Sequence, residues 1–263
     1  MPSFAFIIIA TELQPWKRIL VQGPESTWIQ NLSTNEHYLA IYSDGTYGHT
    51  YQDPSDHRRI KFPEGTSYSW EISQPKFLRP NHAFFNAFEG YGGLIPATVS
   101  AIEYIKKTYD PDFYIRTNVS SYWNLTALRK RLAQLPSEGL YAGVTGPAYS
   151  GLTGRFKSSR YVSGAGMVLS RDVASKLVDI RESIDLTYID DLSIGRSLTK
   201  TSVVPTELTR IDLRHASEID EIDCKKLNDA FHFRCKSEHR IGFASFRSDV
   251  ALMKSVHKKL SQK

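Results

Sequence analysis

Seven consecutive apolar residues, Phe4-Ala-Phe-Ile-Ile-Ile-Ala10, stand near the start of the sequence. A continuous apolar run of this length is typical of a strand that is buried on both faces of a parallel sheet. The run is too short to span a membrane, and no basic segment precedes it as in a signal peptide. The sequence therefore predicts a buried parallel strand in a cytoplasmic protein without a transmembrane segment.

Strand-like and helix-like segments alternate along the rest of the chain. Apolar residues at helical spacing, such as Ile95, Val99 and Ile102, predict helices, and short apolar runs predict the strands between them. This alternation predicts one α/β domain with a mostly parallel sheet flanked by helices. The predicted strands are residues 37–43, 113–117, 141–145 and 202–205; the predicted helices are residues 16–20, 95–107, 121–135, 171–180, 191–198 and 245–260; residues 46–75 are predicted as a loop or a short strand pair, and 146–159 as a loop.

The composition is ordinary for a globular protein, with 41% hydrophobic and 23% charged residues among 263. The net charge of +5 is scattered, so the chain lacks the dense basic stripe with interleaved aromatic residues that indicates a nucleic-acid partner. A mild positive excess fits an anionic small substrate, or simply a solvated surface. Cys224 and Cys235 cannot form a disulfide framework or a zinc site, although they could pair with each other.

A run of small residues precedes an apolar segment in Tyr161-Val-Ser-Gly-Ala-Gly-Met-Val-Leu-Ser-Arg-Asp172. Glycine and alanine leave little side chain in the way of a bound molecule. We therefore expect residues 163–166 to form a loop whose backbone approaches a ligand closely, with the apolar segment anchoring that loop to the core.

An acidic pair, Asp190 and Asp191, stands between Ile189 and Leu192. Adjacent carboxylates in an apolar frame repel each other, which raises at least one pKa toward that of a general base. The pair also suits the first turn of the helix predicted to follow, where acids interact favourably with the helix dipole. Both interpretations can hold, with one acid fixed at the helix start and its neighbour facing a cleft.

Polar side chains follow three of the predicted strands. Thr11 comes after the first strand, Ser43-Asp44 after the second, and residues 116–121 after the third. In open α/β sheets, ligands bind beyond the carboxyl ends of the strands. Ser43-Asp44-Gly45 is adequately explained as a turn. Arg116 and the hydrogen-bonding residues after it offer more than a turn requires, so we expect a ligand there.

Three basic residues alternate near the carboxyl end of the chain, at His232, Arg234 and Lys236. On an extended strand all three would point to one face. Arginine suits bidentate contacts with phosphate, and lysine supplies a point charge. The segment is therefore a candidate phosphate-binding strand, and equally a solvated basic face.

Three stretches in order resemble one enzyme family. Phe113-Tyr-Ile-Arg-Thr-Asn-Val-Ser-Ser-Tyr-Trp-Asn-Leu125 is similar to the segment that carries the acidic DxD motif in the fringe-like β-1,3-glycosyltransferases of family 31. Residues 161–172 resemble that family's glycine-containing segment, and Tyr188-Ile-Asp-Asp-Leu-Ser-Ile-Gly195 resembles the segment that carries its catalytic aspartate. Upstream, Glu89-Gly-Tyr91 and the helix reaching Lys106 resemble a helix of the same family, so the resemblance covers roughly residues 85–200.

The resemblance implies a GT-A fold, with a Rossmann-like, mostly parallel sheet in a single domain made of a nucleotide-binding half (1–125) and an acceptor and catalytic half (126–263). It implies an inverting transfer from a nucleoside-diphosphate sugar, commonly a UDP-sugar, to a glycan acceptor. Asp191 would be the general base, with Asp190 beside it. The expected donor-binding residues are Thr11, Arg116, Asn118, Ser120, Gly164, Ala165, Gly166, His232, Arg234 and Lys236.

The chain departs from the family at the metal-binding motif, because Asn118, Val119 and Ser120 stand where the family has three aspartates. Mn²⁺ and Mg²⁺ prefer anionic oxygen ligands. The resemblance therefore leaves only weak metal ligands, Ser120 and His232, or an enzyme that works without a metal. Arg116 or the basic residues 232–236 would then stabilise the charge on the departing diphosphate, and His215 and His239 are further candidates for the position given to His232.

Two other hypotheses remain open from the sequence. The chain could be a non-catalytic nucleotide- or sugar-binding protein with a degenerate glycosyltransferase fold, although a retained Asp190-Asp191 pair favours catalysis. It could also be a metal-dependent hydrolase that uses the acidic pair. A cytoplasmic sugar pathway in a microbe, an alga or a large DNA virus would fit an enzyme without an export signal.

Overall fold

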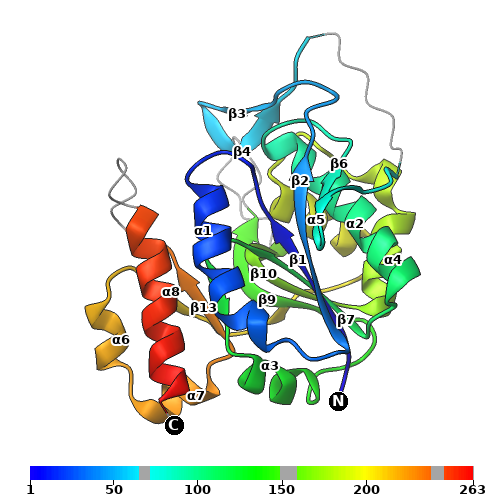
Figure 1. The fold of residues 1–263 in the computed structure, drawn as a ribbon. Helices are drawn as coiled ribbons and strands as arrows, with labels where there is room; N and C mark the ends of the chain where they lie inside the picture. Colours follow the sequence, from blue (N-terminus) through cyan, green and yellow to red (C-terminus); the bar gives the residue numbers. More distant parts are fainter. Residues whose placement is uncertain (65–71, 149–158, 238–245, 263) are drawn as a thin grey trace.

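The computed structural model describes residues 1–64, 72–148, 159–237 and 246–262. Its centre is an eight-stranded sheet with the strand order β11-β9-β10-β7-β1-β2-β6-β5 (Figure 1). Neighbouring strands from β7 to β6 run parallel, β10 is antiparallel to both of its neighbours, and β5 is antiparallel to β6. The strands are β1 (Phe4–Ile9), β2 (Glu36–Ser43), β5 (Lys76–Arg79), β6 (His82–Phe85), β7 (Phe113–Asn118), β9 (Tyr141–Ala148), β10 (Ser159–Ser170) and β11 (Thr206–Glu207).

The side chains of β1 alternate between two hydrophobic cores, one on each face of the sheet. Phe4, Phe6 and Ile8 belong to one core, whereas Ala5 and Ile7 belong to the other. Successive side chains of a strand point to opposite faces, so a strand covered on both sides must be apolar throughout. All five residues are at most 1% exposed. The predicted buried parallel strand is confirmed.

Helices cover both faces of this sheet, as Figure 1 shows. Helices α1, α3 and α8 contribute to the core that contains Phe6, and α2, α4 and α5 to the core that contains Ile7. The predicted α/β architecture, a mostly parallel sheet flanked by helices, is confirmed. Within the described ranges, no helix combines the length and the apolar character needed to cross a membrane. The helices are α1 (Trp16–Gln22), α2 (Leu94–Thr108), α3 (Leu125–Leu132), α4 (Arg171–Asp179), α5 (Asp190–Lys200), α6 (Ser217–Glu221), α7 (Cys224–Asp229) and α8 (Phe246–Ser261).

Two smaller sheets flank the central one. A three-stranded sheet has the order β12-β13-β8, and a hairpin consists of β3 and β4, which confirms the strand pair predicted between residues 46 and 75. The hairpin contacts the segment before α5, because the Ile60 N–H donates to the Thr187 carbonyl and the Ile189 N–H to the Arg58 carbonyl, each at 2.8 Å. The strands are β3 (Tyr51–Asp53), β4 (Asp56–Lys61), β8 (Ser121–Trp123), β12 (Ile211–Leu213) and β13 (His232–Cys235).

The structure corrects several predicted elements. Residues 163–166 are not a loop but the middle of β10, which lies between β7 and β9. The helix predicted at 121–135 begins only at Leu125, because Ser121–Trp123 pair with β13 and Asn124 caps α3 by accepting a hydrogen bond from the Ala127 N–H at 3.3 Å. Residues 202–205 do not form a strand, and Ser202 has a φ of 65°, which an extended chain does not allow.

Two further predictions concern the loop at residues 146–159 and a disulfide between the two cysteines. Residues 146–148 of the predicted loop belong to β9, and residues 149–158 lie outside the described part of the chain. Cys224 is exposed in α7 and Cys235 is buried in β13, and both are free thiols, so the possible disulfide between them is wrong.

Candidate functional site

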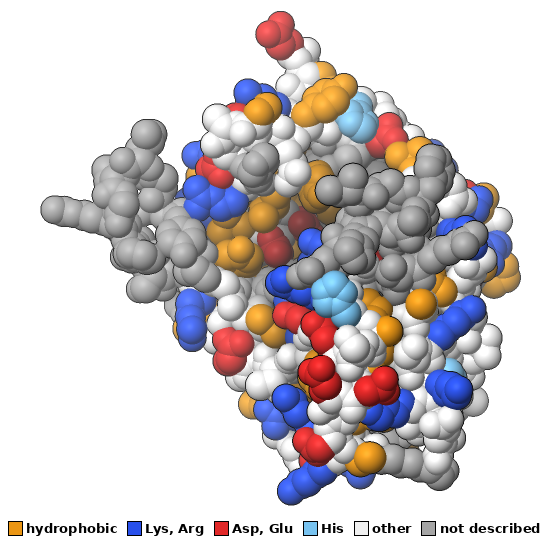
Figure 2. Space-filling view, turned by 90° about the vertical axis from the view of Figure 1, so that its left-hand side faces the viewer, with side chains coloured by type: hydrophobic (Ala, Val, Ile, Leu, Met, Phe, Trp, Pro, Cys, Tyr) orange, Lys and Arg blue, Asp and Glu red, His pale blue; other side chains and the backbone are white. Residues whose placement is uncertain are grey.

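Several of the predicted site residues lie together near the carboxyl edge of the parallel strands. Ile9 at the end of β1 lies in register with Asn118 at the end of β7, and Gly166 of the antiparallel β10 lies opposite Thr117. The face on the side of α8 and the β3–β4 hairpin is hollowed near its middle, where acidic and basic side chains lie together (Figure 2). The carboxyl edge is the part of an open α/β sheet at which ligands bind.

A buried ion pair joins Arg116 and Asp190 in this region. Arg116 on β7 is 5% exposed and Asp190 at the start of α5 is 7% exposed. The Arg116 guanidinium donates one hydrogen bond to the Asp190 carboxylate and another to the Gly164 carbonyl. Burial lowers the pKa of Arg116 to about 10, against the opposing charge of nearby Asp191, so the side chain stays protonated at neutral pH. The pair therefore ties β7, β10 and α5 together.

The small residues of β10 make room for two large polar side chains. A Cβ atom on Gly164 would lie 1.9 Å from Nη1 of Arg116, and one on Gly166 would lie 2.2 Å from Cε1 of His232. Atoms cannot approach that closely, so both positions require glycine as long as Arg116 and His232 keep their places. Residues 163–166 were expected to approach a ligand. In the structure, Gly164 and Gly166 instead make room for Arg116 and His232 of the protein itself.

Asp191 is held in a different way from its neighbour. Its Oδ2 atom accepts a hydrogen bond from the Gly164 N–H at 3.1 Å, and its Oδ1 atom accepts one from its neighbour, the Leu192 N–H, at 2.9 Å. The residue is half-buried, whereas Asp190 is buried. Both acids lie in the first turn of α5, which confirms the helix-start interpretation. Asp191 is the member of the pair that combines a fixed orientation with access to solvent.

Polar atoms at the end of β7 bond to one another. The Asn118 Oδ1 atom accepts hydrogen bonds from the Ser120 N–H at 3.1 Å and from the Ser121 hydroxyl at 3.2 Å. The Ser121 hydroxyl also lies 2.9 Å from the Ala165 carbonyl oxygen, to which the Thr117 hydroxyl donates at 2.8 Å. Asn118 and Ala165 therefore belong to one network, which fixes the backbone of β7 and β10 beside each other.

His232 is buried beneath this network. Its ring stacks on Trp123 with the centroids 4.1 Å apart, and its Nε2 atom lies 3.3 Å from the Ser121 hydroxyl oxygen. Burial, together with the positive charges of Arg210 and Arg234, holds the pKa of His232 well below its usual value. The imidazole is consequently neutral, and the idea of a fully solvated basic face is wrong for this residue, which is only 3% exposed.

A carboxylate that the sequence analysis missed lies beside Ser120. The Ser120 hydroxyl donates to Oδ2 of Asp249 at 2.8 Å, and the Ser237 N–H donates to Oδ1 of the same residue at 2.8 Å. Asp249 belongs to α8 and is only 2% exposed. No sequence motif predicts this contact, because Asp249 is 129 residues away from Ser120. The sequence of α8 indicates only a basic, amphipathic helix.

The other predicted residues are placed as follows. Thr11 follows β1, where its hydroxyl oxygen accepts a hydrogen bond from the Leu13 N–H at 3.2 Å. Arg234 is half-buried in β13, and Lys236 is exposed just after that strand. The His215 N–H donates to Glu218 at 3.2 Å, and His239 lies outside the described residues.

The described residues do not contain three His, Cys, Asp or Glu side chains grouped so that they could hold a metal ion. Ser120 and His232, the expected weak ligands, contact Asp249 and Ser121 respectively. Hard divalent cations prefer several anionic oxygens, and the Asn118–Ser120 segment supplies none. Within the described part of the chain, these donors do not by themselves form a divalent-cation site.

Comparisons with known proteins leave the family of the chain open. No family model matches the sequence, and no curated protein matches it. Among solved structures, a glycosyltransferase involved in glycosylation of the major capsid of PBCV-1 aligns with a TM-score of 0.43 and 8% identity over 96% of this chain and 99% of that one. The inositol-1-phosphate CTP transferase from T. maritima aligns with a TM-score of 0.44 and 10% identity over 96% of each chain. Both TM-scores are below 0.5, so neither likeness identifies the activity of this chain.

The packing around Arg116 predicts the effect of Gly164→Ala. The added methyl group displaces the guanidinium from Asp190 and the Gly164 carbonyl, and we expect it to lower the free energy of unfolding by about 1–3 kcal/mol. Urea denaturation measures this loss. Gly146→Ala in β9 is the matched control, because its Cβ atom would approach only the ring of Tyr161, at 3.3 Å. A loss at Gly164 no larger than the loss at Gly146 would contradict the proposed packing.

The buried ion pair predicts a strong effect of Arg116→Met. Asp190 would be left as a buried carboxylate without its cation, and we expect this to cost about 3–5 kcal/mol in the free energy of unfolding. The loss should shrink as the pH falls, because burial raises the pKa of an unpaired carboxyl and protonation removes its charge. Combining Arg116→Met with Asp190→Leu should recover most of the stability. Additive losses in this double-mutant cycle would show that the two residues are not coupled.

Proposed function

We propose that this chain is a glycosyltransferase that transfers a sugar from a nucleoside-diphosphate sugar, commonly a UDP-sugar, to a hydroxyl group of a glycan, with inversion at the anomeric carbon. One observation carries the proposal: two adjacent acids near the carboxyl edge of the sheet differ in burial and in hydrogen-bond partners. Asp190 is buried and paired with Arg116, whereas Asp191 is half-buried and oriented by the Gly164 N–H. Their order along the chain also follows the family 31 resemblance.

In the proposed reaction, Asp191 accepts the proton of the acceptor hydroxyl as that oxygen attacks the anomeric carbon. A carbon–oxygen bond forms on one face of the sugar, and the bond to the diphosphate oxygen breaks on the opposite face. The nucleoside diphosphate leaves with the bonding electron pair. A positioned carboxylate is suited to this step, because a general base must lie within hydrogen-bond reach of the proton it removes.

Asp190 has a positioning role in this proposal instead of a second basic role. Its carboxylate is neutralised by the Arg116 guanidinium, and this guanidinium also binds the carbonyl of Gly164. The N–H of Gly164 in turn donates to Asp191. The ion pair thus holds Gly164 through its carbonyl, and the N–H of the same residue orients the proposed base.

The charge of the leaving diphosphate needs a source of positive potential other than Arg116. The positive charges of Arg210 and Arg234 both lower the pKa of His232, so both lie near its ring. The Arg210 guanidinium lies within 3.2 Å of the Ser163 hydroxyl oxygen, next to Gly164. Arg210 is already paired with Asp212, with its Nε atom 2.7 Å from Oδ1, but that carboxylate is exposed, whereas the partner of Arg116 is buried. We assign the diphosphate to Arg234 and Arg210, with Lys236 contributing at longer range. Stabilising charge as it develops on a leaving group lowers the barrier to its departure.

Asp191→Asn tests the proposed base. The amide keeps the shape of the side chain but cannot accept the proton, so we expect the rate of sugar transfer to fall about 10²–10⁴-fold. The affinity for the nucleotide should remain close to that of the unsubstituted chain. Asp179→Asn is the control, because it removes the same charge from an exposed position at the end of α4. Sugar transfer retained by the Asp191→Asn variant would refute the assignment, and transfer absent from both the unsubstituted and variant chains would favour a non-catalytic binding protein.

Nucleotide binding without a metal is a separate prediction. Thermal denaturation in the presence of a panel of nucleotide sugars should show a rise of several degrees in Tm for at least one donor, because a ligand that binds only the folded state stabilises it. We expect this rise to persist in EDTA, since the Asn118–Ser120 segment provides no anionic metal ligand. A rise in Tm that appears only with Mn²⁺ would contradict donor binding without a metal. The absence of any rise would contradict donor binding itself.

A further inference from the structure

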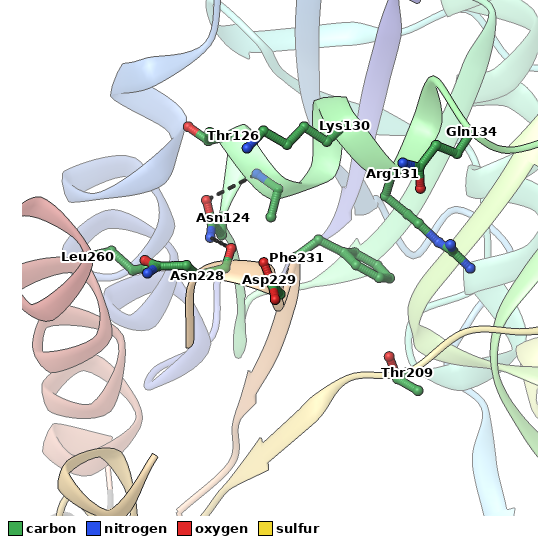
Figure 3. A pocket seen from close by; sticks show the side chains of 11 residues that line it. Asn124, Thr126, Lys130, Arg131, Gln134, Thr209, Asn228, Asp229, Phe231 and Leu260 are labelled. Atoms are coloured by element: carbon green, nitrogen blue, oxygen red, sulfur yellow. Dashed lines mark hydrogen bonds between the residues drawn. The ribbon is translucent and has the colours of Figure 1, made fainter. Parts of the chain in front are cut away.

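A groove of about 670 Å³ lies between α3, α7 and the segment that joins β11 to β12 (Figure 3). It shares no residue with the site at the carboxyl edge of the sheet. Figure 1 shows α3 and α7 at the end of the molecule where the chain begins, with the β3–β4 hairpin at the other end. That hairpin contacts Ile189, just before the acidic pair. The groove therefore lies away from the acidic pair, although its lining residues Thr209 and Phe231 directly precede Arg210 and His232 of the carboxyl-edge site.

Two cations on α3 line this groove, and no carboxylate in the described part of the chain pairs with them. Arg129, Lys130 and Arg131 follow one another in the sequence. Arg129 binds both oxygens of Glu36, at 2.6 and 2.7 Å, on another side of the helix. In the described ranges, neither Lys130 nor Arg131 forms an ion pair, although both line the groove. Lys130 is exposed and Arg131 half-buried. Their positive charge is therefore available to a ligand.

The groove is held open by a fixed frame. Asn124 caps α3 through Ala127, and its side-chain amide donates to the backbone carbonyls of Asn228 and Ala230 at 3.1 and 3.2 Å. This single side chain ties the start of α3 to the end of α7. Ala127 lies on the groove side of α3 and leaves space there because its side chain is short. A ligand would meet a site that is already formed, which lowers the entropic cost of binding.

The remaining lining groups suit hydroxyl groups and an apolar patch. Asn228 and Asp229 line the groove from α7, and Gln134 lines it from just beyond the end of α3. Figure 3 shows the side chains of Arg131 and Phe231 extending into the space above Thr209. Amides and a carboxylate exchange hydrogen bonds with hydroxyl groups, and the Phe231 ring offers an apolar surface.

We propose that this groove binds an anionic, hydroxyl-bearing small molecule of the sugar phosphate or sugar acid type. The oxyanion would contact Arg131 and Lys130, since guanidinium and ammonium groups bind phosphate and carboxylate through charge-assisted hydrogen bonds. The hydroxyl groups would contact Asn228 and Asp229. The carboxylate of Asp229 in the same groove disfavours a long polyanion such as a nucleic acid. A pocket with a few convergent polar groups around an apolar patch is typical of small-molecule sites.

Isothermal titration calorimetry on the full chain tests this proposal with glucose 1-phosphate, glucuronate and inorganic phosphate. We expect one of the two sugar compounds to bind more tightly than inorganic phosphate, and the tighter of the two identifies the phosphate or the carboxylate as the preferred oxyanion. Equal binding of phosphate and both sugars would overturn the role of the hydroxyl-binding groups. Binding of none of the three would overturn the site.

Charge variants locate the ligand. The double substitution Lys130→Gln with Arg131→Gln should weaken binding of the preferred sugar compound by about tenfold or more, equivalent to about 1.4 kcal/mol. Lys225→Gln with Lys226→Gln is the matched control, because it removes two exposed positive charges from α7 outside the groove. An equal loss in both double variants would show that only overall charge matters, which would overturn the proposal.

Two further variants separate this inference from the proposed function and from an effect on folding. Thr209→Glu places a negative charge on the exposed opposite wall, and it should weaken binding without removing any packed side chain. Arg234→Gln removes a cation that the proposed function assigns to the diphosphate and that lies outside the groove lining, so it should leave binding of the sugar compound unchanged. If Arg234→Gln abolished this binding, the ligand would belong to the carboxyl-edge site and the groove proposal would fail, whatever the outcome for sugar transfer.

Discussion

The buried contact between Arg116 and Asp190 constrains most of the architecture around the candidate site. Removing a cation and an anion from water costs free energy that only close pairing and further hydrogen bonds offset. The Gly164 carbonyl supplies one such bond, so the pair fixes the central strand β7, the neighbouring strand β10 and the first turn of α5 together. The glycine at 164 follows from this constraint, because any Cβ atom there would overlap the guanidinium. This one ion pair thus accounts for the positions of β10 and of the first turn of α5 beside β7, and for the glycine at position 164.

A similar dependence appears on the other side of β10. His232 stacks on Trp123 and lies against Gly166, so a buried neutral imidazole occupies the space that a larger side chain would need. Burial keeps its pKa low, and the positive charges of Arg210 and Arg234 act in the same direction. The three-stranded sheet that contains His232 is in this way attached to the central sheet through polar side chains as well as through the apolar core.

The sequence predicted the helices and strands that are specified by their own apolar spacing. It did not predict elements and contacts that depend on residues far away in the chain. The run around Phe6 specified β1, and helical spacing specified α2, α4, α5 and α8, because burial periodicity is a local property. Ser121 to Trp123 form a strand only because β13, more than a hundred residues away, pairs with them. The small residues of β10 were predicted to form a loop beside a ligand, whereas in the structure they form a strand packed against Arg116 and His232. The contact of Asp249 with Ser120 has no signal in the sequence.

The neutral segment at Asn118 and Ser120 is consistent with the rest of the charge distribution. Aspartates at these positions would repel an incoming diphosphate unless a metal ion neutralised them. Here Arg116 is paired with Asp190, so its charge is not available to offset further acids. Asp249 does not restore the missing charge in accessible form, since it is buried and accepts hydrogen bonds from Ser120 and Ser237. In the proposed function the diphosphate is therefore assigned to Arg234 and to Arg210, whose existing partner is the exposed Asp212. The neutral residues at 118 and 120 and the pairing of Arg116 with Asp190 therefore fit together, because a site with fewer anions needs less added positive charge to bind an anion such as the proposed donor.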